Sequence, residues 1–297
     1  YPIMKKLIAV LAIIVIAIVG FAAFKGSETP QKATNKISII TSTDFYAELA
    51  QTVVGDHGTA TAIIKHDNIS PEDYEPTTAV AKKVNGTDIV IANGLGYDAW
   101  LTKLAKSSPK SQLVEVGEDV LHDKMGQNPH LWNDHNTMIQ SAHYLADLLS
   151  KKDPAHKADY QANAKKYIAS LQPITDLVTQ LKAKSNQQDV AQTEPVFEYM
   201  WDTLGYHVMD NDFSEAIEEG NDPSPATLSA LKTAITSHKI AFIVNNKQTT
   251  SSTVSNIIDL AKANHIPVVN VTETIPNGEH YVSWKLAELK QIEAIMK

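Results

Sequence analysis

The sequence predicts an α/β protein with two parallel-sheet lobes, joined by a long rigid helix, and a ligand cleft between the lobes. Short β-branched runs alternate with helical patterns in both halves of the chain, which is typical of parallel sheets covered by helices. Between the two halves lies a helical pattern of roughly thirty residues without Gly, which would extend roughly 45 Å at the standard rise. Because this exceeds one layer of a small domain, we interpret the pattern as a connector.

Residues 1–25 are predicted to be an export signal or a membrane anchor. An uninterrupted apolar run at 7–24 follows Lys5 and Lys6, and its length is near the lower limit for spanning a bilayer. We favour a retained anchor, because small residues do not occupy both required positions of a cleavage site at 21–24. The polar stretch 26–36 would then tether an extracytoplasmic protein to the cell surface, whereas cleavage would release it.

The first lobe is predicted to occupy residues 37–150. The β-branched run at 37–40 predicts its first strand, and the apolar run at 88–92 predicts a strand that is buried on both faces. Helical patterns cover 45–54 and 136–150, the second with a clear amphipathic face. The same alternation predicts the remaining elements, which are strands at 59–64 and 112–116 and helices at 77–85 and 97–106.

The connector is assigned to residues 151–186 and the second lobe to residues 187–297. The helical pattern of the connector covers 154–184 and has one mild interruption at Pro173. Two lobes on such a helix leave a cleft where the strand ends converge. In the second lobe we expect strands at 189–193, 240–245 and 267–272, and helices at 195–204, 225–237, 251–263 and 281–296.

The composition excludes several classes of function. The chain has 34 acidic residues against 26 basic ones, a net charge of -8, and every basic residue is Lys. Without the bidentate Arg fork, such a chain is a poor nucleic-acid binder. The absence of Cys excludes disulfides, Cys-type zinc sites, iron–sulfur clusters, thiol catalysis and lipid attachment through cysteine. Metal chemistry would therefore depend on the 11 His residues and the carboxylates.

Four short segments at predicted strand ends carry side chains that can bind a metal. These side chains are Glu72, His130, Glu194 and Glu273, two from each lobe. One imidazole with several carboxylates suits a divalent cation of intermediate hardness. The chain has no Walker loop, dinucleotide fingerprint, Gly-x-Ser-x-Gly elbow or His-Glu-x-x-His motif, so a nucleotide enzyme is disfavoured.

Each of these residues also has a simpler explanation. Glu194 precedes Pro195 and could be a favourable charge at a helix N-terminus. His130 could be an ordinary loop histidine, Glu72 part of a solvated turn, and Glu273 a surface residue. None of the four predicts a metal site alone.

From residue 37 to its C-terminus the chain resembles the metal-binding solute-binding proteins of ABC transporters for zinc and manganese, of the cluster A-I type. The resemblance implies two α/β lobes on a rigid helix. It places His130 at the second ligand position of that family, Glu194 at the third, and Glu273 nearest to the acidic fourth. The motifs that carry it are PEDYEP at 71–76, ANGLGYDAWL at 92–101, NPHLW at 128–132, TEPVF at 193–197 and EGNDPSP at 219–225.

The chain departs from the family at the first ligand, where members usually have His after Pro71 and this chain has Glu72. Either Glu72 binds through oxygen, or His66 reaches into the site, or the site is weakened. We favour Glu72, because it occupies the aligned position beside a rigid proline. A site with one His and several carboxylates would lean toward manganese, whereas His66 or His122 would restore zinc character.

The resulting prediction is an extracytoplasmic solute-binding protein, a monomer and not an enzyme, that captures zinc or manganese as cargo for an ABC permease. His130 and Glu194 should then lie on opposite walls of one cleft. Two alternatives remain, a surface metallohydrolase with Asp73 or Glu75 as general base, and an adhesin on the same scaffold. Four protein ligands in a closed cleft would favour transport, whereas three ligands and a water would permit hydrolysis.

Overall fold

The computed structural model describes residues 36–65 and 69–296. From Ile37 onward the chain forms one compact unit. The predicted signal or anchor at 1–25, the tether up to residue 35, and His66 lie outside the described residues. Among the described residues, no helix combines the length and the apolar character that crossing a membrane requires.

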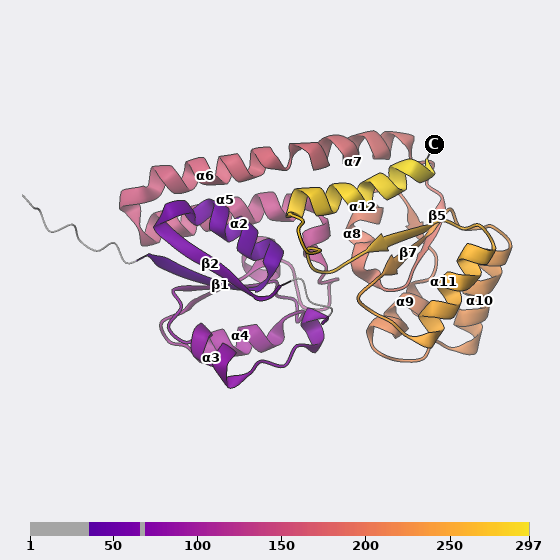
Figure 1. The fold of residues 1–297 in the computed structure, drawn as a ribbon, viewed down its shortest axis with the longest axis horizontal. Coiled ribbons are helices and arrows are strands. Elements are labelled where there is room, and N and C mark those ends of the chain that lie inside the picture. The colour runs from indigo at the N-terminus through magenta and orange to yellow at the C-terminus, as the bar shows by residue number, and fades with distance from the viewer. Residues whose placement is uncertain (1–35, 66–68, 297) are drawn as a thin grey trace, which may run out of the picture. The chain divides into compact units, whose positions relative to one another are not determined.

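The first lobe is built on a sheet of four parallel strands, in the order β2-β1-β3-β4 (Figure 1). All its predicted strands and helices are confirmed to within a few residues. The strands are β1 (Ile37–Thr43), β2 (Gly58–Ile64), β3 (Ile89–Ala92) and β4 (Gln112–Glu115). The helices are α2 (Asp44–Val54), α3 (Thr78–Val84), α4 (Ala99–Lys106) and α5 (His135–Lys152).

Alternation along the strands explains how this sheet is covered on both faces. Ile39 and Ile91 belong to the large core that includes the buried sides of α2 and α5. Ile40 and Val90, one residue away, pack instead in a smaller core with Leu101 of α4. Because successive side chains of a strand point to opposite faces, a continuous apolar run serves both layers.

The second lobe repeats this architecture with a parallel sheet in the order β6-β5-β7-β8. The strands are β5 (Asp189–Gln192), β6 (His207–Val208), β7 (Ile243–Asn246) and β8 (Val268–Val271). The helices are α8 (Glu198–Leu204), α9 (Asn211–Glu218), α10 (Pro225–Thr236), α11 (Ser252–Ala263) and α12 (Tyr281–Ile295). Short helical turns occur along the whole described chain. Before the second lobe these are η1 (Gly55–His57), η2 (Pro71–Asp73), η3 (Val116–Val120), η4 (Leu131–Asn133) and η5 (Pro154–His156), and within it η6 (Pro195–Phe197).

Two elements of the second lobe are absent from the sequence prediction. Strand β6 has two residues, and helix α9 has eight. Helix α9 is amphipathic, with Phe213, Ser214 and Ile217 as its buried residues among polar neighbours, but its eight residues make only about two turns. The spacing of Phe213 and Ile217, one helical turn apart, was the available indication.

The sequence predicted one long helix for the connector, whereas the structure has two helices there. It consists of α6 (Lys157–Ser170) and α7 (Gln172–Lys184), which lie in line along both lobes (Figure 1). The junction at Leu171 precedes Pro173, which has no N–H to donate and whose ring would clash with the carbonyl one turn earlier. Helix α6 packs on α2 and α5 of the first lobe, whereas α7 packs on α8 and α12 of the second.

The two lobes share an aromatic core. The ring of Phe45 at the start of α2 lies 5.0 Å from Trp132 and 5.9 Å from Trp284 of α12, measured between centroids. The buried Tyr281 of α12 donates its hydroxyl to the backbone oxygen of Trp132 at 2.7 Å. Contacts of this kind resist separation of the lobes, because opening them would expose large apolar rings to water.

The Tyr281 contact gives a testable stability prediction. We expect Tyr281→Phe to lower the free energy of unfolding by about 1–3 kcal/mol, because the Trp132 carbonyl would remain buried without its donor. Urea unfolding measures the change. The matched control is Tyr144→Phe, since the half-buried Tyr144 hydroxyl has no hydrogen bond to other residues in the part of the chain that is described. Equal effects of the two substitutions would contradict a specific role for this hydrogen bond.

Candidate metal centre

A cavity of about 230 Å³ is lined by segments of both lobes, including those that follow β5 and β8. All four side chains predicted from the sequence line it, with His130 on the first lobe and Glu194 on the second. Among the described residues no Lys lines this cavity. Its potential metal ligands are one imidazole and six carboxylates, from Glu72, Asp73, His130, Glu194, Glu218, Glu219 and Glu273.

Glu72 enters the cavity from the short turn η2, which begins with the buried Pro71. The indole nitrogen of Trp100 on α4 donates to the backbone oxygen of Pro71 at 2.9 Å and so holds this turn on the first lobe. The Glu72 side chain is the exposed member of the predicted set. It therefore lies at the solvent side of the cavity, while the other three predicted residues are buried.

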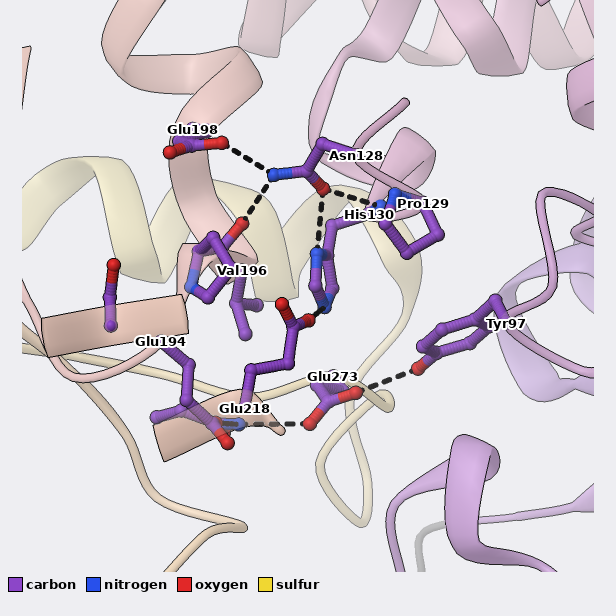
Figure 2. Close-up of polar contacts among 12 residues, drawn as sticks. Tyr97, Asn128, Pro129, His130, Glu194, Val196, Glu198, Glu218 and Glu273 are labelled. Atoms are coloured by element: carbon purple, nitrogen blue, oxygen red, sulfur yellow. Dashed lines mark hydrogen bonds and ion pairs between the residues drawn. The ribbon is translucent and has the colours of Figure 1, made fainter. Parts of the chain in front are cut away.

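The imidazole of His130 is oriented by Asn128. Asn128 Oδ1 accepts from the backbone N of His130 at 3.0 Å and from its Nδ1 at 2.7 Å (Figure 2). An accepting oxygen at Nδ1 requires the proton there, which leaves the lone pair of Nε2 free for a metal. Burial lowers the pKa of His130 to about 3, so the ring is neutral. Asn128 Nδ2 donates in turn to Pro195 O at 2.8 Å and to Glu198 Oε2 at 2.6 Å, both in the second lobe.

Glu194 and Glu273 are held together by neutral donors. The side-chain amide of Asn246, at the end of β7, donates to Glu194 Oε2 at 2.5 Å and to Glu273 Oε1 at 2.8 Å. Tyr97 of the first lobe donates its hydroxyl to Glu273 Oε2 at 2.8 Å (Figure 2). Glu273 is thus fixed from both lobes by uncharged groups, which orient its oxygens without neutralising its charge.

Glu218, the last residue of α9, lines the cavity but was not among the residues predicted from the sequence. Its Oε1 lies 3.4 Å from His130 Nε2, the nitrogen that is free to bind (Figure 2). Ligating atoms of Glu72, His130 and Glu218 all lie within 4.8 Å of one another. Glu194 and Glu273 line the same cavity but are not part of this closest group. The recognised motif at 219–225 begins one residue after Glu218, so the residue escaped notice together with its helix.

Of the two alternative histidines, His122 alone is among the described residues. His66 lies outside the described residues. His122 is described but does not line the cavity. The described part of the site therefore contains one imidazole, from His130.

Desolvation, and after it repulsion from neighbouring acids, raises the pKa values of the carboxyl groups in the cavity. Partial desolvation at the cavity, followed by repulsion from Glu273 and other acids, raises the pKa of Glu72 to about 7. Burial, with repulsion from Glu72 and other acids, raises the pKa of Glu218 to about 8. Burial raises the pKa of Glu273 to about 7 and also raises that of Glu194, although hydrogen bonds from Asn246 oppose both shifts. A bound cation would favour the ionised form of all four groups, because it supplies the positive charge that the cavity lacks.

The sequence matches a known protein family and several proteins that are named for metal binding or metal transport. The model of the family described as "Zinc-uptake complex component A periplasmic" matches residues 39–295. The chain is 26% identical over 211 residues to the manganese-binding lipoprotein MntA of Halalkalibacterium halodurans, which covers 68% of this chain and 69% of that protein. It is 26% identical over 310 residues to a metal ABC transporter substrate-binding lipoprotein of Lactococcus lactis subsp. lactis, covering 97% and 96%. For some other relatives the match spans 56–62% of their length.

The fold is also similar to solved structures. A manganese-bound periplasmic metal binding protein from Candidatus Liberibacter asiaticus matches with a TM-score of 0.73 and 17% sequence identity. The match covers 88% of this chain and 100% of that one. This similarity confirms the predicted two-lobed α/β fold.

The raised pKa values predict how metal-free protein responds to pH. The ordinary value for these glutamates is 4.5, and in the fold the values rise to about 7 for Glu72 and Glu273 and about 8 for Glu218. The folded state therefore binds more protons than the unfolded state between these values. The stability contribution of these groups is full below the unfolded pKa and is lost as pH rises through 7 to 8.

We therefore expect the midpoint temperature of thermal unfolding of metal-free protein to decrease as the pH is raised from 5 to 8. Glu218→Gln should flatten this dependence, because the pKa of Glu218 is raised further than those of Glu72 and Glu273. The matched control is Glu219→Gln, since Glu219 is adjacent and exposed. A steeper dependence in Glu218→Gln, or the same flattening in Glu219→Gln, would contradict the electrostatic interpretation.

Proposed function

Because the chain belongs to the family of zinc-uptake complex component A, periplasmic, we propose that it is an extracytoplasmic solute-binding protein that captures a divalent metal ion. The ion is cargo, which the protein passes to the permease of an ABC importer. The observation that carries the proposal is a cavity lined from both lobes by six carboxylates and one neutral imidazole, with no Lys among its described lining residues. Such a cavity can be neutralised by a cation and repels anions.

We assign the ligands to Glu72, His130, Glu194 and Glu273, with Glu218 as a further carboxylate. His130 would bind through Nε2, because Asn128 occupies Nδ1. On metal binding, the carboxyl groups release the protons that their raised pKa values retain near neutral pH. Ligands from both lobes would hold the ion across the boundary between them.

The ligand chemistry favours manganese over zinc. Carboxylate oxygens suit manganese, whereas zinc sites draw more strongly on imidazole and thiolate. The described site offers one imidazole among many oxygens, and the similarity to a manganese-binding lipoprotein agrees with this preference. We retain Glu72 as the replacement for the usual first histidine, since its carboxylate lies within 4.8 Å of the His130 and Glu218 ligating atoms.

Capture and release account for the site better than hydrolysis does. A hydrolytic metal needs an open position for water, whereas five candidate ligands surround this cavity. Neither a metallohydrolase nor an adhesin gains support from the relatives. The N-terminal segment at 1–25 would tether the protein to the membrane as a monomer, with its cavity facing the permease.

The central role of His130 is testable by metal titration. Wild-type protein, stripped with a chelator, should bind one Mn²⁺ per chain in isothermal titration. His130→Ala should weaken binding by more than the roughly 10–100-fold typical of changes to the surroundings of a metal ligand. His122→Ala is the control and should bind as wild type does. Normal binding by His130→Ala with loss in His122→Ala would show that the site lies elsewhere.

A second prediction concerns metal choice. Glu72→His should shift the ratio of zinc to manganese affinity toward zinc, because an imidazole replaces a harder carboxylate. Competition titration with both metals measures the ratio, and Glu75→His in the exposed part of the same segment is the matched control. If Glu72→Ala binds metal normally while His66→Ala does not, His66 is the ligand and our assignment of Glu72 is wrong.

A further inference from the structure

A buried ion pair on α12 lies outside the cavity. Lys285 and Glu288 are 1% and 3% exposed, and Lys285 is the only buried Lys among the described residues. Lys285 Nζ donates to Glu288 Oε2 at 2.8 Å and to Asn133 Oδ1 at 2.6 Å, and it lies 3.6 Å from the ring centroid of Trp284. Burial lowers the pKa of Lys285 and raises that of Glu288, and the contact between them opposes both shifts.

Stability alone does not explain such a pair. Removing two charges from water is costly, and well-packed apolar replacements of such a pair are often neutral or stabilising. We therefore seek a functional role for the pair, and its hydrogen-bond partners indicate which segments that role involves.

The contacts of the pair lead to three metal-binding segments. Asn133 follows His130 by three residues, and its Nδ2 donates to the backbone oxygen of Val196, two residues after Glu194. Glu288 Oε1 accepts at 3.3 Å from the backbone N of Thr272, the residue before Glu273. One buried cluster thus touches the chain within three residues of each of these ligands, on both lobes.

A second contact from α12 strengthens the link to Glu273. The indole nitrogen of Trp284 donates to Thr272 Oγ1 at 2.9 Å. Thr272 is therefore held at its backbone by Glu288 and at its side chain by Trp284, two residues that lie one turn apart on α12. Lys285 also fixes the amide of Asn133, because an oxygen that accepts from Lys285 leaves the Asn133 nitrogen directed at Val196.

We propose that Lys285, Glu288 and Asn133 form a positioning cluster that holds the segments of His130, Glu194 and Glu273 in register and thereby sets metal affinity. This proposal rests on the proposed function. Lys285 does not line the cavity, so it acts through Asn133 and Glu288. An apolar side chain in its place would leave two buried acceptors without their donor and free the segments to shift.

The test separates positioning from simple stability. Lys285→Met should lower the thermal midpoint and weaken Mn²⁺ binding roughly 10–100-fold, as for other residues that orient metal ligands. The double variant Lys285→Met with Glu288→Leu removes both charges, so it should regain much of the thermal midpoint. Its affinity for Mn²⁺ should stay at least roughly tenfold below wild type, because Asn133 Oδ1 still lacks its donor Lys285 and the backbone N of Thr272 still lacks its acceptor Glu288. Lys290→Met, on an exposed position of the same helix, is the control for loss of one charge.

Recovery of both stability and Mn²⁺ affinity in the double variant would overturn the proposal and leave a purely structural pair. Asn133→Leu provides an independent measurement, since it cuts the link to Val196 while Lys285 and Glu288 remain paired. It should weaken Mn²⁺ binding at least roughly tenfold, and wild-type affinity in this variant would also overturn the proposal. Failure of the wild-type protein to bind Mn²⁺ would instead refute the proposed function.

Discussion

Mutual repulsion among the buried carboxylates of the cavity is the constraint that the rest of the structure has to accommodate. Glu194 and Glu273 are almost fully buried and share one neutral donor, Asn246, while Glu72 and Glu218 flank the neutral His130. Asn and Tyr donors stabilise such groups without cancelling their charge. The cavity thus retains negative charge that a divalent cation can neutralise, and uncharged donors hold the candidate ligands in place.

Holding like charges together requires a rigid frame. The aromatic core of Phe45, Trp132 and Trp284 joins the lobes beneath the cavity, and α6 and α7 run along both of them. Hydrogen bonds from Asn128 to the second lobe and from Tyr97 to Glu273 cross the same boundary. The segments of His130 and Glu273 are therefore tied to the opposite lobe, which limits how far the side chains that line the cavity can move apart.

Much of this architecture was predictable from local sequence. Apolar runs such as 88–92 identify buried parallel strands, and Pro beside Glu72 and Glu194 marks the turns that carry these candidate ligands. The rest depends on contacts between distant residues. Glu218 ends a short helix of about two turns, and it approaches His130 only because α9 packs into the core of the second lobe through Phe213 and Ile217. Lys285 resembles any surface lysine in sequence, and its burial follows from the packing of α12 against both lobes.

The most direct test of the account is the number of imidazoles bound to the metal. Electron spin echo envelope modulation of wild-type protein loaded with one Mn²⁺ per chain reports nitrogens coordinated to the ion. We predict modulation from a single imidazole, assigned to His130 by its loss in His130→Gln, with oxygen in the remaining positions. Modulation from two imidazoles, or from none, would contradict a site built from one histidine and a ring of carboxylates.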